Sequence, residues 1–223
     1  MIPWENLGSA TIPNHGGELR LSKRGEEYSI RVNNCELMNS RAHGSEEALA
    51  KLSCRRVAQR EKPQILIGGL GMGFTTAAAL QHLPKSATIV VAELVAGLVE
   101  WNRKIFGHLA GDPLQDRRVR VEVGDVAQLL KQSERAFDAI LLDVDNGPQG
   151  LTQPENSWLY GPSGLRAARK ALKPQGVLAV WSVAPDALFS KRLQQAGFTI
   201  EETRPRAIGQ GKGARHCVWL ASL

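Results

Sequence analysis

The sequence predicts an α/β fold in which a mostly parallel β-sheet is built with crossover helices. From Pro63 onward, short apolar runs alternate with stretches of helical periodicity, which is typical of a parallel sheet. A glycine-rich turn, GGLGMG, joins the first of these runs directly to a helical stretch. The last two apolar runs have no helical stretch between them, so we expect them to form a hairpin whose final strand runs antiparallel to its neighbours.

Residues 1–43 are expected to form a small N-terminal extension. Residues 1–17 carry prolines and glycines with no apolar period, which indicates an irregular lead-in. Polar and apolar residues then alternate in three short stretches. This alternation predicts a β-hairpin extension with antiparallel strands at 18–22, 27–32 and 36–38.

Residues 44–223 are expected to form the main domain, which opens with a helix. Ser45 is a plausible N-cap, acidic residues follow it in the first turn, and arginines occupy the last turn, in accordance with the helix dipole. The five predicted parallel strands are the runs PQILIGG, SATIVVAE, RVRVEVGD, FDAILLDVD and GVLAVWS, and the strands of the terminal hairpin are FTIEETRP and RHCVWLASL.

Composition narrows the classes of function. Three cysteines without paired spacing predict neither a disulfide framework nor a zinc site, and we expect no metal. The chain shows no leader and no apolar run long enough to span a membrane, so a cytoplasmic protein is expected. The net charge of +6 is spread over scattered lysines and arginines without interleaved aromatic residues. This pattern argues against nucleic acid as a partner and favours a small-molecule substrate.

The glycine-rich turn is the first candidate for ligand binding. Gly69, Gly71 and Gly73 allow a ligand to approach the backbone, and the helix N-terminus behind them favours polar or anionic groups. The next strand ends at Glu93, twenty residues after Gly73. An acid at this position can accept hydrogen bonds from both hydroxyls of a ribose.

Two further strands end in acids. Gly124 and Asp125 follow the third strand, where Asp125 can accept a hydrogen bond from an adenine amino group. The fourth strand ends at Asp143, and Asp145 lies in the turn sequence after it. Because ligands bind at the carboxyl edge of open α/β sheets, we expect these residues to converge on one ligand.

In this order, the motifs resemble those of class I S-adenosylmethionine-dependent transferases, and within that fold those of the spermidine synthase-like branch. The resemblance covers about residues 44–223 and implies a Rossmann-like sheet of order 3-2-1-4-5-7-6 with the last strand antiparallel. The N-terminal extension resembles a shortened N-terminal β-domain of that branch, which leaves a homodimer possible.

The resemblance also implies roles for individual residues. Glu93 would hold the ribose of the cofactor, Asp125 its adenine, and Asp143 would face the sulfonium. The residues that would flank the methionine portion are Gly69, Gly71 and Gly73. A nicotinamide-binding Rossmann enzyme is the main alternative fold, but its fingerprint is G-x-G-x-x-G, whereas these glycines are spaced G-x-G-x-G.

Two reactions are compatible with this resemblance. Aminopropyltransferases typically carry an acid in the glycine turn and an Asp-x-x-Asp pair, whereas this chain has Leu70 and Met72 in the turn and Asp143-x-Asp145 after the strand. An uncharged turn with free N–H groups suits the carboxylate of S-adenosylmethionine. The sequence therefore favours methyl transfer to a small amine- or hydroxyl-bearing substrate. The alternative is an aminopropyltransferase, or spermidine synthase, that uses decarboxylated S-adenosylmethionine and a diamine.

Asp143 and Asp145 are the candidate catalytic residues, because strand-end carboxylates can orient an amine or accept its proton. Acids at a helix start and aromatic residues near a core also have purely structural explanations. With that alternative left open, the weaker candidates for substrate contact are His43, Glu46, Asn146 and Tyr160.

Overall fold

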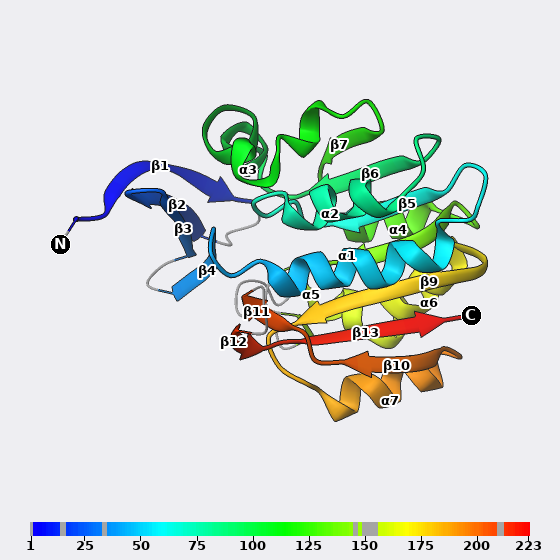
Figure 1. Cartoon of the computed structure of the whole chain (residues 1–223). Helices are drawn as coiled ribbons and strands as arrows, with labels where there is room; N and C mark the ends of the chain where they lie inside the picture. Colours follow the sequence, from blue (N-terminus) through cyan, green and yellow to red (C-terminus); the bar gives the residue numbers. More distant parts are fainter. Residues whose placement is uncertain (1, 14–16, 33–34, 145–146, 149–155, 209–211) are drawn as a thin grey trace.

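The computed structural model describes residues 2–13, 17–32, 35–144, 147–148, 156–208 and 212–223 (Figure 1). Within these residues the chain forms a large central sheet, an N-terminal sheet beyond the carboxyl ends of its parallel strands, and a small hairpin (Figure 1). None of the described helices combines the length and apolar character needed to span a bilayer.

The central sheet has the predicted topology. Its described strands follow the order β10-β13-β9-β8-β5-β6-β7, which is the order 3-2-1-4-5-7-6 when the strands are numbered within the sheet. All neighbouring pairs from β9 to β7 are parallel, whereas β13 is antiparallel to both β9 and β10. The strand bounds are β5 Gln64–Gly68, β6 Thr88–Glu93, β7 Val119–Val123, β8 Phe137–Leu142, β9 Leu172–Ser182, β10 Thr199–Thr203 and β13 Cys217–Ser222.

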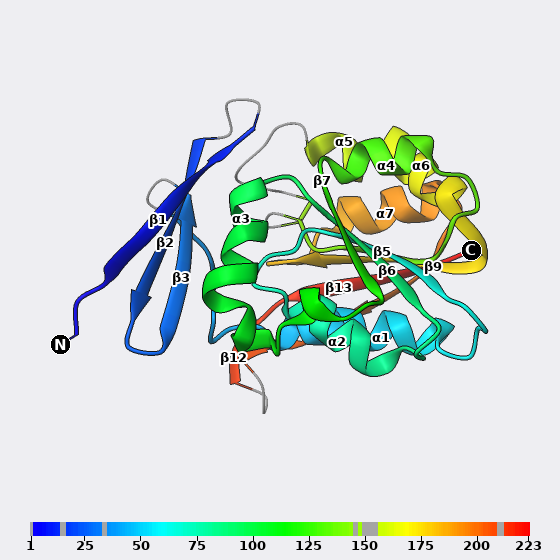
Figure 2. The ribbon, with the colours of Figure 1, turned by 90° about the horizontal axis from the view of Figure 1, so that it is seen from above.

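Helices cover both faces of this sheet (Figure 2). Alternate residues of a strand face opposite sides, so Ile140 of β8 packs with one group of helices and Leu141 with the other. The first face is covered by α4 Val126–Gln132, α5 Asn156–Tyr160, α6 Pro162–Ala171 and α7 Ala187–Gln195, and the second by α1 Gly44–Val57 and α2 Phe74–His82.

Helix α1 begins one residue earlier than the predicted cap. His43 is the N-cap residue and makes no side-chain cap hydrogen bond, whereas Ser45 lies inside the first turn. The prediction of Ser45 as the N-cap is therefore wrong, because its hydroxyl is engaged elsewhere, by groups from β9 and the C-terminal part of the chain.

The N-terminal sheet contains a strand that the sequence did not reveal. Residues 5–12 were expected to be irregular, yet Glu5–Ile12 forms β1 and pairs antiparallel with β2. As an edge strand, β1 has a single buried residue, Ile12, and shows no clear alternation, and a register shift between Asn6 and Gly8 interrupts its period. The order is β1-β2-β3-β4, with β2 Gly17–Arg24, β3 Glu27–Val32 and β4 Cys35–Asn39.

A separate apolar core joins the N-terminal sheet to the main domain. Leu21 and Ile30 of the sheet pack with Met72 of the glycine-rich turn, Phe74 at the start of α2, and Phe106. Helix α3, Ala96–Trp101, lies against β1 and continues into a π-helical turn at Asn102–Phe106 and 3₁₀ turns at Gly107–Ala110 and Pro113–Gln115 (Figure 2). The small hairpin consists of β11 Arg206–Ile208 and β12 Lys212–Arg215.

Contact between α3 and β1 requires a glycine at position 97. A Cβ atom on Gly97 would lie 2.5 Å from the Cβ of Ala10, closer than two carbon atoms can pack. We expect Gly97→Ala to lower the free energy of unfolding by about 1–3 kcal/mol despite the better helix propensity of alanine. Urea denaturation measures this change. Gly124→Ala is the matched control because a Cβ there meets open space, and equal stability of the two variants would contradict the predicted contact.

Candidate active site

The strand-end residues predicted from the sequence line one cavity between the two sheets. It has a volume of about 120 Å³ and lies at the carboxyl edge of the central sheet. Leu37 and Met38 of β4, together with Ile12 and Leu19, close it from the N-terminal side. The predicted residues that line it are Gly69, Gly71, Glu93, Gly124, Asp125 and Asp143.

Glu93 ties the end of β6 to the glycine-rich turn. Its Oε2 accepts a hydrogen bond from the N–H of Leu70 at 2.9 Å, and its Oε1 accepts one from the N–H of Val95 at 2.8 Å. The residue is only 6% exposed, and this burial raises the pKa of its carboxyl group. Each carboxylate oxygen can accept a second hydrogen bond, so the predicted contact with ribose hydroxyls stays compatible with this arrangement.

Gly69 allows the turn to touch the end of β8. It has a φ of +90°, and a Cβ atom there would collide with the carbonyl oxygen of Asp143. The N–H of Asp143 donates to the carbonyl of Gly68 at 2.8 Å, which fixes the strand end beside the turn. This backbone contact therefore fixes the position from which the side chain of Asp143 extends toward the cavity.

The side chains between the glycines point away from the cavity. Leu70 packs into the core of the central sheet, and Met72, 1% exposed, packs into the core beneath the N-terminal sheet. The N–H groups of the turn are also engaged: those of Gly69, Leu70 and Gly73 donate to Ala92 O, Glu93 Oε2 and Leu70 O. The apolar character of the turn thus reflects packing and provides no free N–H groups at these positions for a ligand carboxylate.

Two carboxylates face a second, smaller cavity that shares a wall with the first. This cavity of about 50 Å³ is lined by Glu46 at the start of α1, Asp143, Gly71, Trp181, Leu37 and Met38. The hydroxyl of Thr75 donates a hydrogen bond to Asp143 Oδ2. The cavity therefore has an acidic side formed by two elements that are distant in sequence.

Burial shifts the ionisation of both acids. It raises the pKa of Asp143 to about 6, although the hydrogen bond from Thr75 opposes the shift. Burial raises the pKa of Glu46 well above its ordinary value, and the negative charges of Asp143 and Glu47 raise it further. Asp143 ionises first, and its charge then holds the proton on Glu46. The pair accordingly favours a state with one negative charge and one proton over a state with two negative charges.

A bulge in β4 places two consecutive side chains on this site. Residues of a regular strand alternate between faces, but the pairing of β3 with β4 skips Leu37, so Leu37 and Met38 both reach the cavities. Met38 Sδ lies 3.5 Å from the Cβ position of Gly71. These two side chains line both the acidic cavity and the adjoining one.

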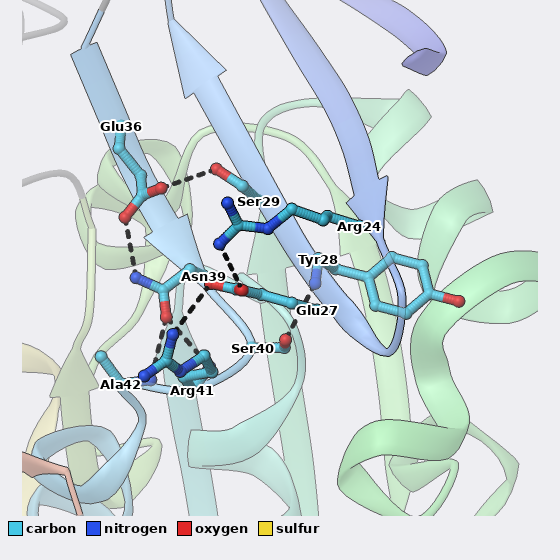
Figure 3. Close-up of polar contacts among 9 residues, drawn as sticks. All are labelled: Arg24, Glu27, Tyr28, Ser29, Glu36, Asn39, Ser40, Arg41 and Ala42. Carbon is cyan, nitrogen blue, oxygen red and sulfur yellow. Dashed lines mark hydrogen bonds and ion pairs between the residues drawn. The ribbon is translucent and has the colours of Figure 1, made fainter. Parts of the chain in front are cut away.

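Polar contacts fix β4 in this position (Figure 3). Glu36 accepts hydrogen bonds from Ser29 Oγ and Asn39 Nδ2, both at 2.8 Å. The side-chain oxygen of Asn39 accepts from the N–H groups of Arg41 and Ala42 at 2.9 and 3.0 Å, which shapes the turn that leads into α1. The network thereby connects the placement of Met38 with that of Glu46.

A buried hydrogen-bond network supports the acidic cavity from its other side. Trp181 Nε1 donates to Ser45 Oγ at 3.0 Å, and Ser45 Oγ lies 2.7 Å from Nδ1 of His216. The rings of Trp181 and His216 meet edge to face, and burial lowers the pKa of His216, which favours its neutral form. The sequence did not reveal the link between these three residues, and Ser45 was expected only as a helix cap, because no local motif connects positions that far apart.

Several predicted residues lie elsewhere. Gly73 lines neither cavity, since its Cβ position faces Asn102 and Pro113. The ring of His43 stacks on Phe74 at 4.0 Å and lines a different surface groove, with Nδ1 2.8 Å from Glu47 Oε1.

Tyr160 is not at the cavities either. It is buried in the core, where its hydroxyl donates to the carbonyl of Val144 at 3.3 Å. The structure thus gives Tyr160 a core contact and His43 a contact in the other groove, and neither residue lines the two cavities. Asp145 and Asn146 lie outside the described residues. In the part of the chain that is described, no group of three His, Cys, Asp or Glu side chains is arranged to hold a metal ion.

Comparison with known proteins places this geometry in context. The family model for the spermine/spermidine synthase domain matches residues 44–194. A polyamine aminopropyltransferase of Nitrosomonas europaea is 32% identical over 122 residues, 55% of this chain and 36% of the relative. One from Prochlorococcus marinus is 25% identical over 127 residues, 56% of this chain and 43% of the relative. The matched part of the chain thus spans less than half the length of either relative.

Solved structures share the fold. Spermidine synthase from Thermotoga maritima superposes with a TM-score of 0.78 at 17% identity, covering 97% of this chain and 72% of that one. Human methyltransferase-like protein 13 in complex with SAH superposes with a TM-score of 0.61 at 22% identity, covering 81% and 82% of the two chains. At these identities the likeness concerns the fold, and it agrees with the predicted α/β architecture.

Removing the hydroxyl of Ser45 tests the network behind the acidic cavity. Ser45→Ala leaves the buried indole N–H of Trp181 without its partner, so we expect the free energy of unfolding to fall by about 1–3 kcal/mol. Ser53→Ala is the matched control, because Ser53 is equally buried in α1 and its hydroxyl donates within the helix to the carbonyl of Leu49. Urea denaturation of both variants measures the difference in the free energy of unfolding. Equal losses would show that the network stabilises the fold no more than a hydrogen bond within the helix.

Proposed function

This chain belongs to the spermine/spermidine synthase domain family, and on that premise we propose that it transfers an aminopropyl group from decarboxylated S-adenosylmethionine to a diamine. The single observation that carries the proposal is the pair of half-buried carboxylates, Glu46 and Asp143, that face one cavity beside the glycine-rich turn. Buried carboxylates are stabilised by a cationic partner, and both proposed substrates bring amines.

The sequence-based preference for methyl transfer from S-adenosylmethionine is wrong. It is contradicted by the match to the spermine/spermidine synthase domain and by relatives named polyamine aminopropyltransferases. The physical reason lies in Leu70 and Met72. Their apolar side chains were interpreted as a preference for a zwitterionic ligand, but they belong to two cores and do not line the cavities.

We assign the larger cavity to the adenosyl part of the donor. Glu93 would accept hydrogen bonds from the ribose hydroxyls, and Asp125, which caps α4 through a 2.8 Å hydrogen bond from the N–H of Ala127, would accept one from the adenine amino group. Gly71 lines both cavities, so a donor that passes along it would bring its reactive carbon from the nucleoside site to the acidic one.

In the proposed transfer, an unprotonated amine nitrogen attacks the carbon beside the donor sulfonium. The new C–N bond forms while the C–S bond breaks and methylthioadenosine leaves, and the attacking amine loses a proton. Asp143 is the group proposed to accept that proton, because it is ionised above pH 6 and Thr75 holds its carboxylate in place. Glu46, on the facing element, would hold a second ammonium group.

An assay of product formation tests the proposal. Purified protein incubated with putrescine and decarboxylated S-adenosylmethionine is expected to form spermidine and methylthioadenosine, and S-adenosylmethionine is expected not to replace the donor. Mass spectrometry identifies the products. Absence of spermidine at high protein concentration would reject the function.

Asp143→Asn is expected to lower kcat/KM about 10²–10⁴-fold, because the amide cannot accept the proton of the attacking amine. The substitution keeps the shape of the side chain and removes a buried charge, so the variant should remain folded. Asp116→Asn is the control for loss of a carboxylate remote from the cavities, since Asp116 pairs with Arg118 near β7. Full activity of Asp143→Asn would remove Asp143 from the mechanism.

Binding of the diamine is expected to release a proton from Glu46. An ammonium beside this residue favours its ionised form, so its raised pKa falls, and the proton is released at pH values between the bound and free pKa. Calorimetric titrations at a series of pH values, each in buffers of different ionisation enthalpy, count the protons and locate the pH of largest release. The wild type should release roughly one more proton per diamine than Glu46→Gln, and equal counts would contradict the assignment of the proton to Glu46.

A further inference from the structure

A basic groove lies at the edge of the central sheet opposite the candidate active site. It has a volume of about 680 Å³ and is formed by α6, α7, the start of β9 and the segment before β8. Figures 1 and 2 show α6 and α7 near the C-terminus, away from the N-terminal sheet. Five cationic side chains line the groove: Arg135, Arg166, Arg169, Lys170 and Arg192.

Protein carboxylates neutralise only part of this charge. Lys170 pairs with Glu134 at 3.2 Å, and Arg192 lies 3.6 Å from Asp186. In the described ranges, no carboxylate lies within 4 Å of Arg135, Arg166 or Arg169. The groove thus presents three arginines whose charge is not compensated by an ion pair.

Backbone contacts hold two of these arginines in place. The N–H of Arg135 donates to the carbonyl of Lys170 at 2.9 Å, which seats this residue against the end of α6 in a left-handed conformation with φ of +45°. Across the groove, the guanidinium of Arg169 packs over Gly197, where a Cβ would lie 3.4 Å from Nε. Gly197 therefore leaves room for Arg169 between α6 and α7.

Helix dipoles account for only part of the arrangement. Arg169, Lys170 and Arg192 lie in the last turns of α6 and α7, where cations are favourable. Arg166 lies one turn earlier and repels Arg169 and Lys170 at spacings of three and four residues. Arg135 lies outside any helix and adds to this repulsion. An external anion would relieve it.

We propose that this groove binds an oligophosphate group, an activity separate from aminopropyl transfer. Guanidinium groups match phosphate oxygens with paired hydrogen bonds, and several arginines together suit a chain of phosphates. The volume lies in the range of small-molecule sites. No aromatic side chain occurs among the lining residues that are described, so bases have nothing to stack on, which disfavours single-stranded nucleic acid as the ligand.

Calorimetric titration of the full chain with inorganic triphosphate tests the proposal. We expect saturable binding with one site per chain, weakened at least about tenfold in the double variant Arg166→Gln/Arg169→Gln. The matched control is Arg103→Gln/Lys104→Gln, which removes two exposed cations that pair with Glu100 outside the groove. Circular dichroism and urea denaturation establish that each variant is folded, and Arg166→Lys/Arg169→Lys, which keeps the charge, should lie between the wild type and the glutamine variant.

Titrations with further ligands show which kind of molecule supplies the phosphates. Cytidine triphosphate that binds more tightly than inorganic triphosphate would indicate a nucleotide ligand, and equal affinities would indicate the phosphate chain alone. Three results would overturn the proposal: no saturable binding of triphosphate, an equal loss in the control variant, or binding of an oligoribonucleotide without binding of triphosphate.

Discussion

The closure of the carboxyl edge by the N-terminal sheet is the constraint on which the candidate site depends. Leu37 and Met38 partly cover Asp143 and Glu46 and limit the access of water to them, and this desolvation is the main cause of both raised pKa values. If the sheet were displaced, both carboxylates would be hydrated and ionised, and a bound amine would compete with water for them. Closure therefore converts two ordinary acids into a pair with a strong preference for a cation. The buried charge opposes folding, so part of the apolar contact between the sheets offsets it.

The same contact explains the composition of the glycine-rich turn. Its glycines bring the backbone against Asp143 and the cavity, while the side chains between them serve packing: Leu70 belongs to the core of the central sheet, and Met72 to the core that anchors the N-terminal sheet. An acid at position 72 would enter an apolar core without a partner. In this chain the carboxylates that face the ligand region come from α1 and from the residue that follows β8 instead. A loop motif shows where a ligand can approach, but the direction of each side chain depends on what packs against the loop.

Some parts of the fold and of the candidate site could be predicted from the sequence, and others could not. The strand order and the convergence of Glu93, Asp125 and Asp143 were predictable, because a parallel sheet brings successive strand ends to one edge. Strand β1 was not, since an exposed edge strand has little need for apolar alternation. Trp181, Thr75 and Met38 reach the site only through tertiary contacts, and the bulge that turns Leu37 inward leaves no signal in the local pattern. His43 and Tyr160 were chosen by their chemistry, but stacking on Phe74 and core burial take them elsewhere.

Charge segregation between the two edges of the sheet resolves an apparent conflict in the proposed function. A chain of net charge +6 should repel a cationic diamine. However, the basic groove lies at the far ends of strands such as β8, whose six residues extend about 20 Å, more than twice the screening length of about 8 Å at physiological ionic strength. Salt thus weakens the repulsion from the distant arginines, whereas the half-buried carboxylates act on an amine at contact distance and are screened less. The local field at the acidic cavity, and not the net charge of the chain, therefore determines which ligand this edge attracts.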